Sequence, residues 1–522
     1  MIRIGRIGIE IHRLDKPELD KSVADKPLPN KIESDETMLD RYVPDKLMPD
    51  QYLQEGNSVE KDNGEERNRN EEMDHGGERS KSVEQYIDTV TGQMRSRRAQ
   101  TAIAEELRDH MDCQMAEYMA KGMNEETAAA QAVKDMGDPV AVGVQLDQVH
   151  RPRPAWGMLA LILMLSLMST FLWNALGVRN LVPRVIGLAA MVIVYLVDYS
   201  FLAGRGRRLA ATFLVLYVLG ALCFPITIRG KMRWIGIGGL HFSLEQLAYL
   251  YLPLFGAIVY DHRRESYVGV LKCILWALPI PYLLLRLPDT SDALWIFLSC
   301  MVVVSVAIGR GWFQVKGKRV LAALWGALTA ALVGMLAVIL QPGQNLLMEY
   351  QRARIEGYLN GNRNQVNYMQ MMATRLLKSS RLFGEGSIGN IPDYDVATMR
   401  SDFAISLLSA RCGKAAVAVA VVLLVALIVT VFQIALRQSN ELGTIVGCSV
   451  GMVFGIQTLV YLLNNMGWIP YMSGYLPLLS YGGSGAVVSY ILLGLVLSVY
   501  RYRDIPLVEK AKSRNHTLPE RE

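Results

Sequence analysis

Ten long apolar runs constrain this 522-residue chain more than any other feature of its sequence. Each run has close to the ~20 residues that a helix needs to cross a bilayer, and short polar segments separate most of them. The runs cover residues 157–176, 185–203, 209–228, 241–260, 267–285, 292–309, 320–340, 415–436, 443–463 and 484–500. Because a membrane-spanning backbone must satisfy its own hydrogen bonds, they predict an all-α polytopic membrane protein with about ten transmembrane helices.

The composition excludes several other classes of protein. Hydrophobic residues make up 51% of the chain, charged residues 20%, and the mean hydropathy is +0.20, which is too apolar for a soluble enzyme of this size. The net charge of +5 is small and spread over the loops, so no nucleic-acid partner is expected. The six cysteines lie far apart and form no CxxC pair or His/Cys cluster, so we expect neither a disulfide framework nor a metal site of that kind.

The polar residues divide the chain into four predicted parts. Residues 1–82 are rich in Asp, Glu, Lys, Asn and Pro and are expected to form a disordered tail. Residues 83–150 show helical spacing and predict a small cytoplasmic module, with Asn124 as the N-cap of a helix that stops near Gly137. This module resembles the prefix modules that precede some bacterial permeases. Residues 151–505 form the transmembrane domain, with a long outer loop over 341–402, and 506–522 form a cytoplasmic tail.

Basic residues predict the orientation in the membrane. They concentrate in every second connection between the apolar runs, which places both termini in the cytoplasm by the positive-inside rule. Two outer connections, residues 229–234 and the loop 341–402, carry cations against this bias. Cations kept on the outer side indicate an anionic ligand, although long loops also escape the rule.

The segment Asn465–Ser484 is the most specific signal in the chain. Its order Asn-x-Gly, Pro, Ser-Gly, Leu-Pro and Ser-Tyr-Gly-Gly-Ser resembles the signature loop of the SEDS family, the shape, elongation, division and sporulation proteins of the FtsW/RodA/SpoVE type. Further matches to the family are Arg233-Trp234-Ile235 with Glu245, Tyr350 to Ile355, Tyr368 to Gln370, Gly384-Glu385-Gly386 and Ser401-Asp402-Phe403. The resemblance covers roughly residues 155–505. The chain departs from the family where Ala410 to Gly413 replaces a common Glu-Glu pair.

The resemblance implies a peptidoglycan glycosyltransferase that polymerises lipid II with inversion on the outer face of the bacterial cytoplasmic membrane. The process served would be cell division, elongation or sporulation. The implied partners are the undecaprenyl-pyrophosphate-linked substrate, membrane lipid and a class B penicillin-binding transpeptidase. No certain cofactor is implied, with a divalent cation such as Mg²⁺ left open.

The reaction needs a general base for a sugar hydroxyl and positive charge near the leaving pyrophosphate. The match to the family's Thr-Asp-Phe assigns the catalytic role to Asp402. The alternative is an N-cap, because Ser401-Asp402 before a helix is an ordinary way to satisfy free N–H groups. One residue could do both.

The resemblance also nominates substrate-binding residues. Arg352 and Arg354 rank first, because arginine pairs well with phosphate oxygens. The others are Arg233, Glu245, Gln370, Lys378, Ser480, Gly482 and Gly483. Alternatives stay open for several of them: a solvated loop helix for Lys378, a structural pair for Arg233 and Glu245, and a plain interhelical turn for the Ser480–Gly483 segment.

Two other functions compete with polymerisation. One is a flippase or transporter of lipid-linked precursors, for which ionisable groups near the middle of the membrane would be expected. The other is a non-catalytic scaffold of the cell-wall machinery, which the missing Glu-Glu pair favours.

Overall fold

The computed structural model describes residues 81–178, 181–228, 231–237, 240–287, 289–339, 349–359, 368–386 and 393–505. Most of the predicted tail, residues 1–80, and the whole predicted C-terminal segment, 506–522, lie outside these ranges. Two compact units divide between Asp147 and Gln148.

The first unit is a small helical module. A helix over residues 81–92 is followed by α2 (Arg97–Ala120), α3 (Glu125–Met136) and α4 (Pro139–His150). The side chain of Asn124 accepts a hydrogen bond from the Thr127 N–H, and Gly137 follows α3 with a φ of 84°, so the predicted start and stop of this helix are confirmed. Its core is formed by buried aliphatic and aromatic side chains such as Tyr86, Leu107 and Met111.

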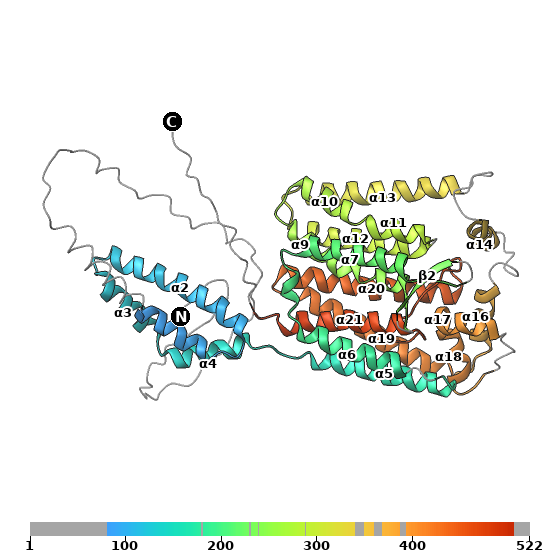
Figure 1. Cartoon of the computed structure of the whole chain (residues 1–522), viewed down its shortest axis with the longest axis horizontal. Helices are drawn as coiled ribbons and strands as arrows, with labels where there is room; N and C mark the ends of the chain where they lie inside the picture. The colour runs from blue at the N-terminus through green and yellow to red at the C-terminus, as the bar shows by residue number, and fades with distance from the viewer. Residues whose placement is uncertain are drawn as a thin grey trace, which may run out of the picture. The chain divides into compact units, whose positions relative to one another are not determined.

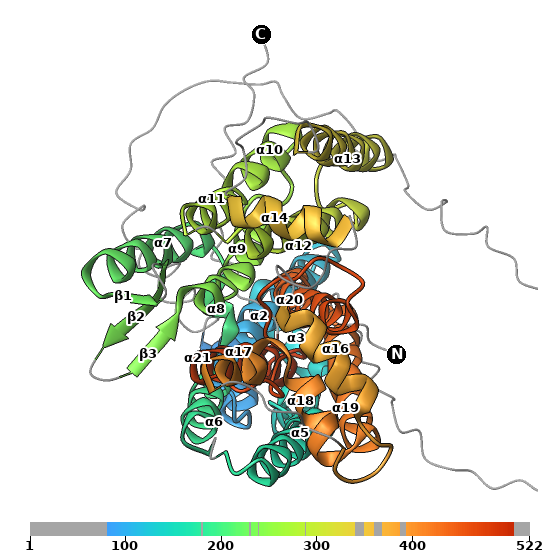
Figure 2. The same cartoon turned by 90° about the vertical axis from the view of Figure 1, so that its right-hand side faces the viewer.

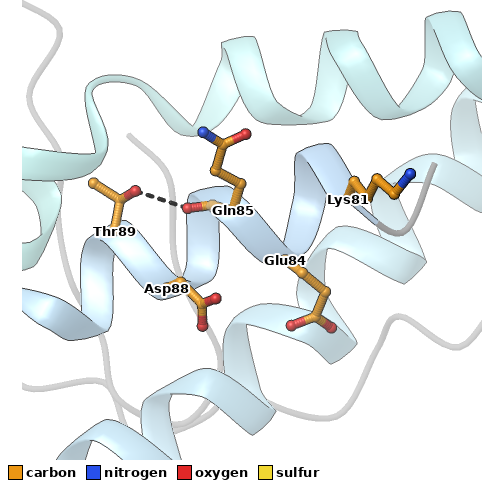
Figure 3. Close-up of a pocket in the computed structure, with 5 residues that line it drawn as sticks. All are labelled: Lys81, Glu84, Gln85, Asp88 and Thr89. Carbon is orange, nitrogen blue, oxygen red and sulfur yellow. Dashed lines mark hydrogen bonds between the residues drawn. The ribbon is translucent and has the colours of Figure 1, made fainter. Parts of the chain in front are cut away.

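One face of the first helix is polar. Lys81, Glu84, Gln85, Asp88 and Thr89 surround a hollow there (Figure 3). Glu84 forms a two-pronged hydrogen bond with Arg108 of α2, at 2.7 and 2.8 Å, which ties the two helices together. The polar side chains of this face are those expected of a solvated helix surface.

Most predicted spans are long apolar helices. By length and composition, eight helices in the described ranges could cross a membrane. They are α5 (Trp156–Ala175), α7 (Gly206–Cys223), α10 with α11 (Tyr267–Trp276, Pro279–Arg286), α12 (Thr290–Gly309), α13 (Gly317–Ile339), α19 (Lys414–Leu436), α20 (Glu441–Met466) and α21 (Gly483–Arg501). The other two runs contain the shorter helices α6 (Leu181–Leu196) and α9 (Tyr251–Asp261). The predicted polytopic helical fold is confirmed.

The two runs that flank Arg233 end differently from the prediction. Instead of continuing as helix, residues at their facing ends form a three-stranded antiparallel sheet of β1 (Pro225–Ile228), β2 (Lys231–Ile237) and β3 (Leu240–Ser243). Trp234 of β2 pairs with Ile226 on one side and Ser243 on the other. Pro225 cannot extend a helix and the isoleucines of β1 favour strand, which explains the change. The short helix α8 (Leu244–Ala248) follows β3 directly.

Small residues let the central helices approach closely. α21 packs against α6, and α20 packs against α9, α12 and α19. A Cβ at Gly494 would lie 2.6 Å from the backbone oxygen of Met191, and one at Gly187 would lie 2.3 Å from the Tyr490 ring. Glycine at these two positions therefore sets the distance between α6 and α21.

The described parts of the long connection between α13 and α19 contain four short helices. They are α14 (Glu349–Leu359), α16 (Tyr368–Ser379), α17 (Asp393–Asp402) and α18 (Ala404–Cys412). The spanning helices run side by side, and these four helices lie with β2 at the same end of the bundle (Figure 1). The end-on view shows α17 between α21 and α18 (Figure 2).

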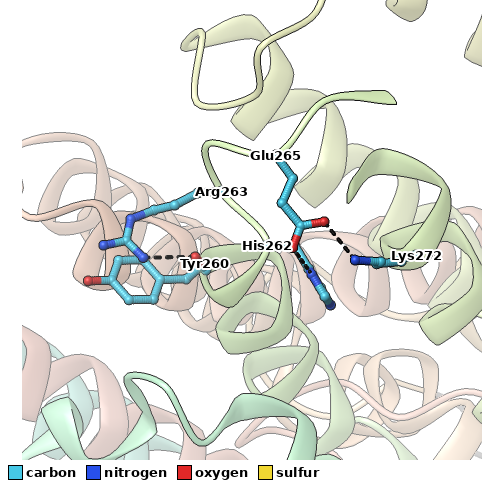
Figure 4. Close-up of polar contacts among 5 residues, drawn as sticks. All are labelled: Tyr260, His262, Arg263, Glu265 and Lys272. Carbon is cyan, nitrogen blue, oxygen red and sulfur yellow. Dashed lines mark hydrogen bonds and ion pairs between the residues drawn. The ribbon is translucent and has the colours of Figure 1, made fainter. Parts of the chain in front are cut away.

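A polar cluster surrounds the turn that follows α9 (Figure 4). Glu265 contacts the Nδ1 atom of His262 and the Nζ atom of Lys272, each at 2.9 Å. The pKa of the Glu265 carboxyl lies below its usual value, and the hydrogen bond with His262 is the largest cause. Arg263 lies 3.7 Å from the ring centroid of Tyr260 and pairs with Glu441 at 2.8 Å, which fastens this turn to the start of α20.

Candidate active site

A cavity of about 640 Å³ opens among the helix ends at the loop-rich end of the bundle. Its walls come from β2, β3, α8, α12, α17, α20, α21 and the loop before α21. Four of the predicted site residues line it: Asp402, Glu245, Gly482 and Gly483. Segments that are far apart in sequence therefore meet at one cavity.

Asp402 is the last residue of α17 and is 6% exposed. Its carboxylate accepts hydrogen bonds from the Ser401 hydroxyl at 2.8 Å and the Tyr471 hydroxyl at 2.7 Å. The Tyr471 ring also stacks on Phe403, with centroids 5.5 Å apart. The backbone oxygen of Asp402 accepts from Asn465 at 3.1 Å, so two residues of the predicted signature segment hold this aspartate.

The N-cap alternative for Asp402 finds little support in the geometry. The next helix, α18, begins at Ala404, and Phe403 occupies its N-cap position without a side-chain cap. The Ala404 N–H donates instead to the Tyr461 hydroxyl at 2.6 Å. The hydroxyls of Ser401 and Tyr471 orient the Asp402 carboxylate beside the cavity.

The signature loop between α20 and α21 supports the end of α17. The Ser480 hydroxyl donates to the backbone oxygen of Ser401 at 2.7 Å and accepts from the Leu476 N–H at 3.0 Å. The Tyr481 N–H donates to the backbone oxygen of Arg400 at 3.1 Å. Ser480 is 1% exposed and is absent from the described cavity lining, so its contacts are those of a positioning residue.

The two glycines differ in what surrounds them. A Cβ at Gly482 would lie 3.1 Å from the Tyr475 ring, whereas among the described residues one at Gly483 would meet only Pro183, at 3.8 Å. Burial raises the pKa of the Tyr475 hydroxyl well above its usual value, so this residue is a neutral phenol at physiological pH. The short distance between position 482 and the Tyr475 ring is by itself a sufficient reason for glycine at this position.

Of the four nominated cations, Arg352 and Lys378 have described side chains, and neither lines the cavity. Arg352 pairs with Glu356 of the same helix at 3.1 Å, and Lys378 is exposed in the last turn of α16. The side chains of Arg233 and Arg354 lie outside the described ones.

Gln370 is 6% exposed and contacts neighbouring backbone groups. Its amide donates to the backbone oxygens of Asn464 and Ile469, both at 2.9 Å. It therefore joins α16 to the end of α20, and it too is absent from the described lining.

Sequence reasoning missed the cation that does line the cavity. Arg400 is the only Lys or Arg among its described lining residues, and its guanidinium carbon lies 5.9 Å from the Tyr481 ring centroid. It stands two residues before Asp402, which is the signal that could have found it. Tyr471 was also missed, because nothing in the sequence indicates which group the hydroxyl of a loop tyrosine will contact.

Three carboxylates meet at the cavity wall contributed by α8 and α12. One oxygen each of Glu245, Asp289 and Asp292 lies within 4.8 Å of the others, and all three side chains are buried. The Tyr249 hydroxyl donates to Asp292 at 2.9 Å. Of the three, only Glu245 was predicted. The pair of aspartates three residues apart at the start of an apolar run was the available signal for the other two.

These observations define a class of protein: a polytopic helical membrane protein with a cavity at one end of its bundle. A buried carboxylate, that of Asp402, and the guanidinium of Arg400 both line this cavity. Residues 155–505 match the FtsW/RodA/SpoVE family, described as cell cycle proteins, and the chain belongs to this family. The family membership indicated by the sequence motifs is thereby confirmed.

Individual relatives agree with this assignment. The chain is 27% identical over 330 residues to a probable peptidoglycan glycosyltransferase FtsW of Thioalkalivibrio sulfidiphilus, covering 61% of this chain and 78% of the relative. It is 26% identical over 306 residues to the FtsW of the same description from Alteromonas naphthalenivorans, covering 56% of each. A chain in the solved structure of a peptidoglycan synthase complex shares the fold with a TM-score of 0.54 and 24% identity, covering 67% of this chain and 98% of that chain.

Proposed function

We propose that this protein is an inverting peptidoglycan glycosyltransferase that polymerises lipid II, with Asp402 as the general base. The observation that carries the proposal is the Asp402 carboxylate at the cavity, oriented by the hydroxyls of Ser401 and Tyr471. The names of the FtsW relatives and the family match support the same activity.

The proposed reaction is a single displacement. The acceptor hydroxyl oxygen forms a bond to the anomeric carbon of the donor, and its proton passes to the Asp402 carboxylate. The bond from that carbon to the pyrophosphate oxygen breaks, and undecaprenyl pyrophosphate leaves with the electron pair. Attack opposite the leaving group inverts the anomeric carbon, as in inverting glycosidases. The guanidinium of Arg400 supplies positive charge at the cavity for the leaving group.

The substitution Asp402→Asn tests the base directly. We expect glycan synthesis from purified lipid II to fall by about 10²–10⁴-fold, because an amide cannot accept the hydroxyl proton. Lipid II binding should persist, since the amide is nearly isosteric and still accepts hydrogen bonds. Asp504→Asn, beyond the far end of α21, is the matched control and should keep the wild-type rate.

The same assay separates the competing functions. A transporter or scaffold would show no polymerisation in the wild type, so Asp402→Asn would change nothing. Near wild-type polymerisation by Asp402→Asn would instead leave the activity in place and exclude Asp402 as its base.

We further propose that both termini and the module over residues 83–150 are cytoplasmic, which puts the cavity at the outer face of the bacterial membrane. The alternation of basic connections supports this orientation. In a cysteine-free background, a cysteine introduced at Lys121 should resist a membrane-impermeant thiol reagent in intact cells, while one at Phe383 should react. Labelling of position 121 from outside would reverse the proposed topology.

A class B penicillin-binding transpeptidase is the partner we propose. A glycan strand made at the outer face must be crosslinked there, and the fold neighbour with a TM-score of 0.54 comes from a peptidoglycan synthase complex. Co-purification of such a transpeptidase with the tagged full chain tests this assignment.

A further inference from the structure

The carboxylates of Glu245, Asp289 and Asp292 form a compact acidic site beside the catalytic cavity. Their side chains are 9%, 3% and 8% exposed, and one oxygen of each lies within 4.8 Å of the other two. Glu245 comes from the first turn of α8, and the two aspartates come from the start of α12. Three buried carboxylates at this spacing repel one another unless something positive lies between them.

A second observation concerns the oxygens of Asp289. Its Oδ1 atom accepts from the Ser291 hydroxyl at 3.0 Å and the Asp292 N–H at 3.4 Å. Its Oδ2 atom is buried and has no hydrogen-bond partner within the described part of the chain. With Oδ1 engaged in capping α12, Oδ2 is the oxygen left for the acidic site. A buried carboxylate oxygen without a donor is costly, so it indicates a ligand.

The charge of the cavity points the same way. Its described lining contains three carboxylates, those of Glu245, Asp292 and Asp402, against the one guanidinium of Arg400. The formal charge of this lining is therefore −2, before Asp289 is counted. Because acids outnumber bases in this described lining, a cation bound beside them would favour entry of a pyrophosphate-linked substrate.

We propose that Glu245, Asp289 and Asp292 bind one divalent cation of the Mg²⁺ class at the cavity wall. Carboxylate oxygens are the ligands such hard cations prefer, and the described site contains no histidine or cysteine that would favour zinc. Three carboxylates leave coordination positions open toward the cavity. Resting on the proposed function, we assign those positions to oxygens of the substrate pyrophosphate.

Binding of Mn²⁺, followed by electron paramagnetic resonance on the full chain in detergent, tests the site without relying on activity. Wild type should show one saturable site that Mg²⁺ displaces. Asp292→Asn should weaken Mn²⁺ binding about tenfold or more, because loss of even an outer-shell partner of a metal costs that much. Asp402→Asn and Asp504→Asn lie outside the acidic site and should bind Mn²⁺ like wild type.

The competing arrangement is a proton shared among the three carboxylates. It predicts no saturable Mn²⁺ site in wild type and a thermal unfolding temperature that Mg²⁺ and EDTA leave unchanged, and either result overturns the proposal. Asp289→Asn removes a cap of α12 as well as a ligand, so Asp292→Asn is the deciding variant. Equal Mn²⁺ binding by wild type and Asp292→Asn would also refute the site.

The two proposals fail in different ways. Saturable Mn²⁺ binding that depends on Asp292, without glycan synthesis by wild type, would retain the metal site and reject the polymerase. Glycan synthesis that continues at full rate in EDTA, with no Mn²⁺ site, would retain the polymerase and reject the metal.

Discussion

Two hydroxyl groups, from Ser401 next in the chain and Tyr471 in the signature loop, hold the Asp402 carboxylate. A base that must receive a proton from a sugar hydroxyl works only within hydrogen-bond reach of it, so its orientation matters as much as its acidity. At the scale of single residues, Tyr471 is thus the positioning residue on which the proposed chemistry depends.

Tyr471→Phe isolates this role. The substitution keeps the ring that stacks on Phe403 and removes only the hydroxyl that donates to Asp402. A hydrogen bond to a charged group contributes about 1.5–3 kcal/mol, so we expect polymerisation to slow by roughly 10–100-fold with the thermal stability nearly unchanged. Tyr282→Phe, on the exposed face of α11, provides the same chemical change away from the cavity and should have no effect. Equal rates for both variants would contradict a positioning role for Tyr471.

At the scale of secondary-structure elements, the ends of α17, α20 and α21 position the residues of the cavity. α17 stops at Asp402, α20 stops at Met466 with Gly467 at a φ of 73°, and α21 starts at Gly483. The loop that links α20 to α21 therefore passes the end of α17 and contacts it through Ser480 and Tyr481. Because α21 begins where this loop ends and packs against α6, a change in that packing would move the end of the loop.

Gly494→Ala tests that packing. The added Cβ would lie 2.6 Å from the Met191 backbone oxygen, and backbone cannot move aside as a flexible side chain can. Overpacking of this kind typically costs about 1–3 kcal/mol, so the unfolding temperature in detergent should fall. Gly326→Ala in α13 is the control: no described residue lies within 4 Å of its new Cβ, and alanine favours helix over glycine. A Gly494→Ala protein as stable as wild type would show that α6 and α21 can separate freely.

On the scale of the whole molecule, the contacts described for the cavity all belong to the unit that begins at Gln148. The polar first 82 residues offer little apolar surface for packing. We propose that the predicted tail, the module and the transmembrane domain are separate parts with separate tasks.

Removal of residues 1–82 should therefore leave lipid II polymerisation in detergent intact. The comparison is with the full chain at equal concentration, and size-exclusion chromatography establishes that both proteins are folded. A folded truncated protein that no longer makes glycan would mean that the tail takes part in the reaction.

The sequence by itself determined the membrane fold, the family and the position of Asp402, because span length, hydropathy and an ordered motif are local properties of a chain. Glu245, Gly482 and Gly483 could be nominated in the same way. Only the tertiary structure brought Arg400 to the cavity, gave Asp402 its Tyr471 partner and assembled Glu245 with Asp289 and Asp292. Those arrangements depend on distances between helix ends separated by tens to hundreds of residues. Such distances follow from how the helices pack, as at Gly187 and Gly494. They cannot be predicted from the periodicity of residues along the chain.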